Sequence, residues 1–348
     1  MTFNRENPFA LRSTLEYELP PFEQIREEHY LAAFYAGTEA QLIEVAEIIK
    51  VPEQANFENT IVALERSGQV LNRMLLVFYN KSSSDTSASL EAIEEEIAPK
   101  LAAHTDSIRL NQVLFARIKR LYENRHTLSL ESEDLWLLER YYRDFIHAGA
   151  HLDEGNRAKL KQANEKLSKL ETQFSKNVLA DTNDLAVIVD DLTQLDGLGE
   201  NEIAAAANAA ADRGLTGKWL IGAVNFTGNP VLGSLRNREL RQRIMDASRL
   251  KGNRDNENDN KLVLLQMAEL RAERAKLFGV RSHAEYVIQE QTAEQPDNVH
   301  NLLRQIVPTA VRNAKTEGAD LQTAIAAKGE DFALQSWDWD LYSEQVRL

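Results

Sequence analysis

Histidine is the residue type that decides which metal chemistry this chain could carry out. The 348 residues include seven histidines and no cysteine, which excludes disulfides, thiol nucleophiles and cysteine-bound metals. Only His147 and His151 stand four residues apart, the spacing that places two imidazoles on one helix face. A zinc site of the H-E-x-x-H type also needs a glutamate directly after the first histidine to activate the metal-bound water, and this position is Ala148. Although Asp153 or Glu154 could supply a third ligand, we expect two histidines at a helix end and no zinc.

A second candidate metal site is the acidic segment from Asp255 to Asn260, in which acidic residues alternate as they do in a calcium-binding loop. The sixth position of such a loop requires glycine for a sharp turn, and it is Asn260 here. The twelfth position requires a bidentate glutamate, and it is Gln266. We therefore expect no calcium site, and predict instead that Asn258 or Asp259 caps the helix that follows.

The remaining motifs that carry chemistry are incomplete or absent. Gly197 and Gly199 lack the third glycine of a dinucleotide-binding loop, and no glycine-lysine-serine/threonine loop or glycine-x-serine-x-glycine elbow occurs. His29 and His283, each near a glutamate, are typical of surface histidines rather than of acid–base catalysts. We assign no catalytic residue, no cofactor-binding residue and no metal ligand to these 348 residues.

The charge of the chain limits its partners. Forty basic and 54 acidic residues give a net charge of −14, which disfavours nucleic acid as a ligand. The densest basic stretch, from Arg117 to Arg125, has helical spacing and is predicted to be a solvated helix face. No apolar run reaches about 18 residues, so we expect no membrane span. The first residues lack the pattern of a secretory signal, and we expect a cytoplasmic protein.

Few residues are available to make turns, so long helices must position whatever site exists. Only 15 glycines and 8 prolines occur, and we predict a mainly α fold, an antiparallel bundle-like lobe of many helices. One predicted helix carries an apolar stripe from Phe57 to Phe78, and a polar loop from Lys81 to Ser87 follows it. A longer helix starting near Asn156 has the clearest periodicity in the chain, at Leu160, Ala163, Leu167, Leu170, Phe174 and Val178. Two short runs rich in strand formers, 185–189 and 219–224, predict one small pair of β-strands.

These elements suggest three parts. Residues 1–20, with Pro8 and Pro20, form an extended arm; residues 21–182 form an N-terminal helical bundle; residues 183–348 form a second helical region that contains the β pair. The final run from Trp337 to Leu348 has a helical pattern, but no glycine, asparagine or proline closes it. We therefore expect the chain to be part of a longer protein.

Whole stretches of the sequence match a known family in order. They include Asn7-Pro-Phe, the segment from Phe57 to Gly68, Lys218-Trp-Leu-Ile, the segment from Leu270 to Gly279, His283-Ala-Glu-Tyr and Trp337-Asp-Trp. On these residues the chain resembles the N-terminal half of a peptidyl-dipeptidase (dipeptidyl carboxypeptidase) of the thimet-oligopeptidase-like family of zinc metallopeptidases. The resemblance extends over essentially all 348 residues.

The resemblance implies a fold and a role. Members of this family are roughly twice as long, almost wholly helical, and shaped as two lobes around a deep channel, with the H-E-x-x-H helix in the second half. The chain is then the non-catalytic N-terminal portion, ending before the catalytic zinc domain and forming one wall of a channel for short peptides. Zinc belongs to the full-length enzyme, and the partner of this chain is the missing C-terminal catalytic region; self-association through the exposed lobe is also expected. The alternative is a stand-alone helical module that binds peptides or proteins without catalysis.

Overall fold

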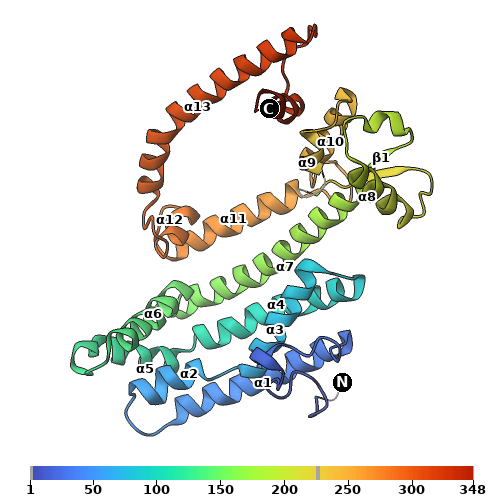
Figure 1. The fold of residues 1–348 in the computed structure, drawn as a ribbon. Coiled ribbons are helices and arrows are strands. Elements are labelled where there is room, and N and C mark those ends of the chain that lie inside the picture. Colours follow the sequence, from blue (N-terminus) through green and yellow to red (C-terminus); the bar gives the residue numbers. More distant parts are fainter. Residues whose placement is uncertain (1–2, 225–227, 348) are drawn as a thin grey trace. The chain divides into compact units, whose positions relative to one another are not determined.

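The computed structural model describes residues 3–224 and 228–347, and it is almost entirely helical (Figure 1). In this described part of the chain only two short strands interrupt the helices, so the mainly α prediction is confirmed. None of the described helices combines the length and the apolar character needed to cross a membrane. The chain forms two compact units. Unit 1 contains Met1–Gln173 and Met267–His283, and unit 2 contains Phe174–Gln266 and Ala284–Leu348.

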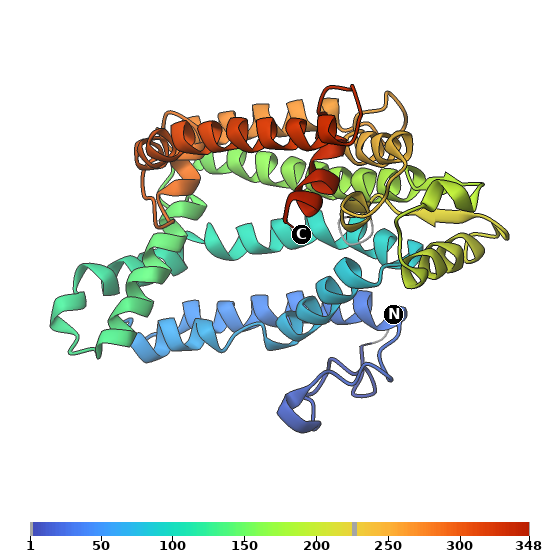
Figure 2. The same ribbon diagram turned by 45° about the horizontal axis from the view of Figure 1, so that its top comes forward.

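Unit 1 is a stack of amphipathic helices. Its longer elements are α1 (Glu27–Lys50), α3 (Gln69–Ser84), α4 (Ala88–Arg109), α5 (Gln112–Glu123), α6 (Ser132–Ala148) and the first part of α7 (Glu154–Asp184). Short turns η1 (Glu16–Glu18), η2 (Phe57–Val62), α2 (Ala63–Glu65) and η3 (Arg125–Thr127) connect them. Helices α1 and α3 lie side by side, as Figure 2 shows in blue. The helices bury two apolar clusters, one around Phe34 and Phe78 and the other around Ile61 and Phe145.

The single helix predicted from Phe57 to Phe78 is wrong, because the structure divides this stretch of unit 1 into separate helical segments. The chain turns at Gly68, whose backbone is left-handed with φ of 72°, so η2 and α2 are separated from α3. A side chain at this position would meet Gln41, since a Cβ would lie 2.4 Å from its Nε2 atom. The predicted loop from Lys81 to Ser87 begins too early, because α3 continues to Ser84 and only residues 85–87 separate it from α4. The apolar spacing continues through the break because both pieces bury residues in the unit 1 core.

Other local features of unit 1 follow from its residue types. The Ser87 hydroxyl accepts a hydrogen bond of 3.2 Å from the Leu90 N–H and caps α4. Of the periodic positions in α7, Leu160, Ala163 and Leu167 are buried, as a helix stripe that faces a core should be.

Unit 2 contains the β pair and the shorter helices. Strands β1 (Val187–Val189) and β2 (Trp219–Ile221) are antiparallel, with Ile188 opposite Leu220, which confirms the predicted pair. The other elements are η4 (Leu192–Leu195), α8 (Glu200–Ala211), α9 (Gly228–Leu232), α10 (Arg238–Arg249), the start of α11 (Lys261–Leu277), most of α12 (His283–Ile288), α13 (Pro296–Ala327), η5 (Ser336–Asp338) and α14 (Trp339–Arg347). Apolar residues of β1, β2 and α10 form one core, and α13 and α14 share another around Ile325 and Tyr342. The last predicted residue of the final helix, Leu348, lies outside the described residues.

Candidate functional site

The two histidines with zinc spacing do not share a helix face. His147 lies in the last turn of α6, which ends at Ala148, and Gly149 then adopts a left-handed backbone with φ of 96°. His151 therefore lies beyond the helix. Both rings approach Phe278, with centroid distances of 6.5 Å from His147 and 5.8 Å from His151. Across residues 3–224 and 228–347, no three histidine, aspartate or glutamate side chains are grouped so that they could hold a metal ion.

The calcium-like segment is a loop held together by ion pairs. Lys261 Nζ lies 2.7 Å from Asp255 Oδ1 and 2.9 Å from Asp259 Oδ2. The Asp259 carboxylate also accepts the Lys261 backbone N–H at 2.9 Å, which is the helix-capping role predicted for it. Hydrogen bonding to the Lys261 side chain is the main cause that lowers the pKa of Asp259 to about 2. Lysine thus occupies the position that a cation would take.

The same loop is anchored to α7 by buried polar groups. Asp181 is completely buried, and its carboxylate accepts hydrogen bonds from the Gly252 N–H at 2.7 Å and from Arg254 at 3.1 Å. Asn260, also buried, accepts a hydrogen bond from Asn177 at 2.9 Å. These bonds satisfy side chains that would otherwise be costly to bury, so the segment stabilises unit 2.

The basic stretch predicted as a solvated face only partly fits this description. Lys119 and Arg120 are exposed, but Arg117 is half-buried and donates hydrogen bonds to Val51 O at 3.3 Å and to Asn59 Oδ1 at 3.0 Å. Arg117 therefore ties α5 to the segment before η2.

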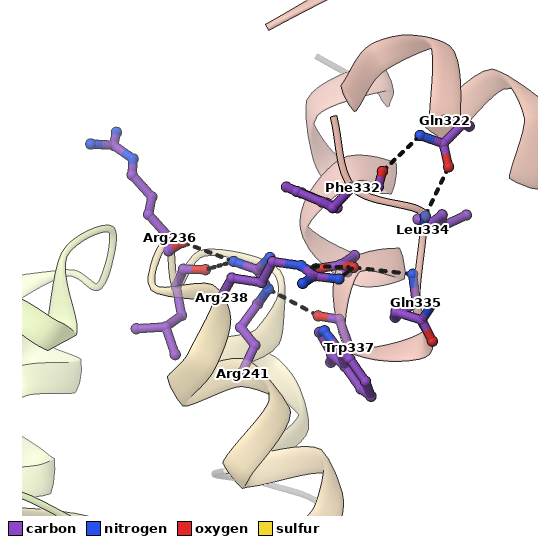
Figure 3. Close-up of polar contacts among 10 residues, drawn as sticks. Arg236, Arg238, Arg241, Gln322, Phe332, Leu334, Gln335 and Trp337 are labelled. Carbon is purple, nitrogen blue, oxygen red and sulfur yellow. Dashed lines mark hydrogen bonds and ion pairs between the residues drawn. The ribbon is translucent and has the colours of Figure 1, made fainter. Parts of the chain in front are cut away.

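A buried charge cluster in unit 2 joins α10 to the segment before α14 (Figure 3). The Arg241 and Asp338 side chains are 1% and 0% exposed, and Arg241 Nη2 donates to Asp338 Oδ1 at 2.8 Å. Arg238 binds the same carboxylate through two nitrogens, with Nε 3.0 Å from Oδ1 and Nη2 2.9 Å from Oδ2. The Gln335 N–H adds a further hydrogen bond of 3.0 Å to Oδ2. One carboxylate thus neutralises part of the charge of two guanidinium groups.

The remaining donors of Arg241 bind backbone carbonyls. They reach Leu235 O, Arg236 O and Trp337 O, each at 2.9 Å. Burial favours the neutral form of Asp338, but hydrogen bonds from Arg238 and Arg241 outweigh it, and the pKa of Asp338 lies below its ordinary value. This network fixes the path of the chain into α14. Trp337 and Trp339 lie in η5 and at the start of α14 rather than in an extended strand.

Two cavities are the remaining candidate sites. In unit 2 a cavity of about 560 Å³ lies between α8 and β2. Small and apolar side chains such as Ala206, Ala209 and Ile221 line it, with Asn201 and Arg213 as polar members. In unit 1 a cavity of about 360 Å³ is bounded by α1, α3, α4 and α6, and its lining includes several charged and polar side chains.

Residues 231–348, which include the cluster of Arg238, Arg241 and Asp338, match the model of peptidase family M3. Over 98% of its length the chain is 38% identical to the dipeptidyl carboxypeptidase of Escherichia coli K12 and 34% identical to that of Salmonella typhimurium LT2, and it covers 50% of each. It is also 26% identical, over 95% of its length, to oligopeptidase A of Escherichia coli K12, of which it covers 49%.

These similarities confirm the resemblance that the sequence motifs indicated. The identity is higher to the dipeptidyl carboxypeptidases than to the oligopeptidases. The chain spans about half the length of the curated relatives it matches.

Proposed function

We propose that this chain is the N-terminal, non-catalytic portion of a zinc metallopeptidase that releases dipeptides from the C-termini of short peptides. The observation that carries the proposal is a similarity over 98% of the chain that covers only half of a dipeptidyl carboxypeptidase. The sequence contains no H-E-x-x-H motif, so the metal ligands must come from the other half. Zinc bound there would polarise the scissile carbonyl and activate water.

In this proposal the chain forms one wall of the substrate channel. Residues 1–20 are its arm, residues 21–182 a helical bundle, and residues 183–348 a second helical region that precedes the catalytic zinc domain. The cluster of Arg238, Arg241 and Asp338 supports this role, because a rigid segment before α14 can hold a neighbouring domain in place. We also propose a cytoplasmic location, since one relative is named a probable cytosolic oligopeptidase A.

The exposed surface of α13 supports the proposal that a further region of the enzyme packs against it. Five large apolar residues on this helix are about half exposed: Leu302, Leu303, Ile306, Val307 and Val311. Their spacing of one, three and four residues places them along one stripe of the helix. An exposed stripe of this kind is typical of an interface. We propose that the catalytic half covers it in the complete enzyme, and that without this half the chain associates with itself.

Reconstitution tests the proposed function. The purified chain with zinc should release no dipeptide from a short peptide, whereas the chain mixed or co-expressed with the C-terminal half of the Escherichia coli relative should do so. A chelator should abolish this release. If the chain alone released dipeptides in a chelator-sensitive manner, the proposal would be wrong and His147 and His151 would need to be reconsidered.

The stand-alone binding module is a second candidate, favoured by the apolar cavity of about 560 Å³ in unit 2. Translation of the reading frame beyond Leu348 separates the two candidates. An H-E-x-x-H motif downstream supports the peptidase portion. A stop codon with no such motif nearby supports the binding module, which should then retain peptides in a pull-down without cleaving them.

A further inference from the structure

The cavity of about 360 Å³ in unit 1 is lined by side chains of different exposure. We call the part at buried His104 its inner end and the part at the more exposed Arg109 and Glu65 its outer end. His104 of α4 forms the inner end; it is 8% exposed, and its Nε2 atom lies 2.7 Å from Gln41 Oε1. Its Nδ1 atom has no hydrogen-bond partner among the described residues. Burial lowers the pKa of His104, so the ring is neutral at pH 7 and adds no charge to the cavity.

The outer end carries a positive centre. Arg109 Nη1 lies 3.4 Å from Asp144 Oδ2, a loose ion pair, and the guanidinium stands 5.6 Å from the centre of the Phe145 ring. Asp144 is bound more tightly by Arg140, whose Nε atom is 2.8 Å from Oδ1. Two guanidinium groups therefore share one carboxylate, which leaves one positive charge, and Arg109 retains N–H donors for an incoming anion.

The outer end also carries a negative centre. The Glu65 carboxylate accepts a hydrogen bond of 2.6 Å from the Tyr141 hydroxyl. Burial and this hydrogen bond raise the pKa of Tyr141, so the hydroxyl remains a neutral donor. No ion pair to Glu65 is formed by the described residues, so its negative charge is not neutralised by a cation. Leu71, Leu75 and Leu101 line the cavity with apolar surface.

We propose that this cavity binds a dipeptide with free termini, its carboxylate on Arg109, its ammonium on Glu65 and its side chains on the leucines. One positive and one negative centre beside apolar walls match a zwitterion better than either a simple anion or an apolar molecule. The inference rests on the proposed function, because a dipeptide is the product that the complete enzyme releases. It adds a product-binding site in unit 1, outside the metal-binding half.

Calorimetric titration of the 348-residue chain with alanyl-leucine tests the site. We expect saturable binding, and loss of about tenfold or more in affinity for N-acetyl-alanyl-leucine and for alanyl-leucine amide, each of which removes one charge. The variants Arg109→Gln and Glu65→Gln should cause similar losses. The control Arg66→Gln, which removes a neighbouring exposed arginine that pairs with Glu58 and does not line the cavity, should bind as the wild type does.

Proton NMR of the His104 ring locates the ligand. Its C–H resonances should shift with the same Kd as the calorimetric titration. Absence of saturable binding, equal affinity for the blocked dipeptides, or binding that leaves the His104 resonances unchanged would overturn the proposal. N-acetyl-alanyl-leucine and alanyl-leucine amide are titrated into the wild-type chain, so these two measurements remain valid even if a variant fails to fold. The reconstitution experiment does not depend on this cavity, so the two proposals can fail separately.

Discussion

At the scale of single residues, Asp338 is a buried charge at the centre of an ion-pair cluster in unit 2. Its carboxylate is fully buried and bound by Arg238 and Arg241, and Arg241 is itself 1% exposed. Removing one member of a buried ion pair leaves the remaining charge without compensation, which costs far more than an exposed pair contributes. The network is therefore a strong determinant of the local structure of unit 2.

The variant Asp338→Asn should destabilise unit 2 by about 3 to 5 kcal/mol, because two guanidinium groups lose their only shared carboxylate. Urea unfolding followed by circular dichroism measures this loss. The matched control is Asp196→Asn, since Asp196 pairs with Arg236 at 3.3 Å where the side chains are 61% and 70% exposed. The control should change the free energy of unfolding by about 1 kcal/mol or less. Equal effects of the two variants would contradict the account of the buried cluster.

The same carboxylate predicts a pH dependence. The pKa of Asp338 in the folded chain lies below its ordinary value of 3.8. A lowered carboxyl pKa contributes stability that is present above the unfolded-state pKa and is lost as the pH falls through the folded-state pKa. The difference in unfolding free energy between wild type and Asp338→Asn should therefore be constant from about pH 7 to about pH 5 and shrink below pH 3.8. A difference that shrank already at neutral pH would contradict this assignment.

At the scale of elements, the crossing of α1 and α3 depends on the absence of a side chain at Gly37. A Cβ built there would lie 2.8 Å from both the Cα and N atoms of Leu71, which are backbone atoms of α3 and cannot move alone. Glycine inside a helix costs about 1 kcal/mol relative to alanine. Glycine is nevertheless needed at position 37, because the two helices pack closely at this point and bury Phe34 and Phe78.

The variant Gly37→Ala should lower the free energy of unfolding by about 1 to 2 kcal/mol, because overpacking outweighs the better helix propensity of alanine. Its control is Gly155→Ala in the first turn of α7, where the nearest atom to a Cβ belongs to a side chain rather than to backbone, Asp153 Oδ1 at 3.3 Å. This control should be neutral or slightly stabilising. Thermal unfolding of both variants measures the difference in their stabilities. If Gly37→Ala were more stable than the wild type, the contact between α1 and α3 would have space for a Cβ and the prediction would be wrong.

At the scale of the whole molecule, the chain exposes a stripe of apolar surface on α13. Leu302 is 57% exposed and Ile306 is 51% exposed. The net charge of −14 opposes association, so the apolar stripe must supply the attraction between copies. In the complete enzyme, the proposed catalytic half would cover this apolar stripe in place of a second copy of the chain.

Sedimentation equilibrium should therefore show dimers or larger species of the wild-type chain at high concentration. The variant Ile306→Glu should shift the population toward monomer, since a charge in an apolar interface costs several kcal/mol. Val113→Glu, at a position 55% exposed on α5, adds the same charge outside the stripe and should have little effect. A wild-type chain that remained monomeric at every concentration would contradict the expected self-association.

Much of the fold follows from the sequence because helix formation depends on local pattern. The strand pair agrees with its prediction, as does the capping role of Asp259, since each depends on residues a few positions apart or on strand propensity. The break at Gly68 escaped prediction, because the apolar spacing continues through it, whereas the left-handed Gly68 backbone and its contacts with Gln41 and Glu44 belong to the tertiary structure.

The tertiary structure alone decided which distant residues meet. Arg241 and Asp338 are 97 positions apart, and Glu65 and Tyr141 are 76 positions apart, so no local spacing connects them. The sequence by itself determined the mainly α class and the resemblance to M3 peptidases, because composition, periodicity and motif order are properties of the chain. Buried ion pairs and cavities are properties of packing, and packing brings together side chains that the sequence keeps apart.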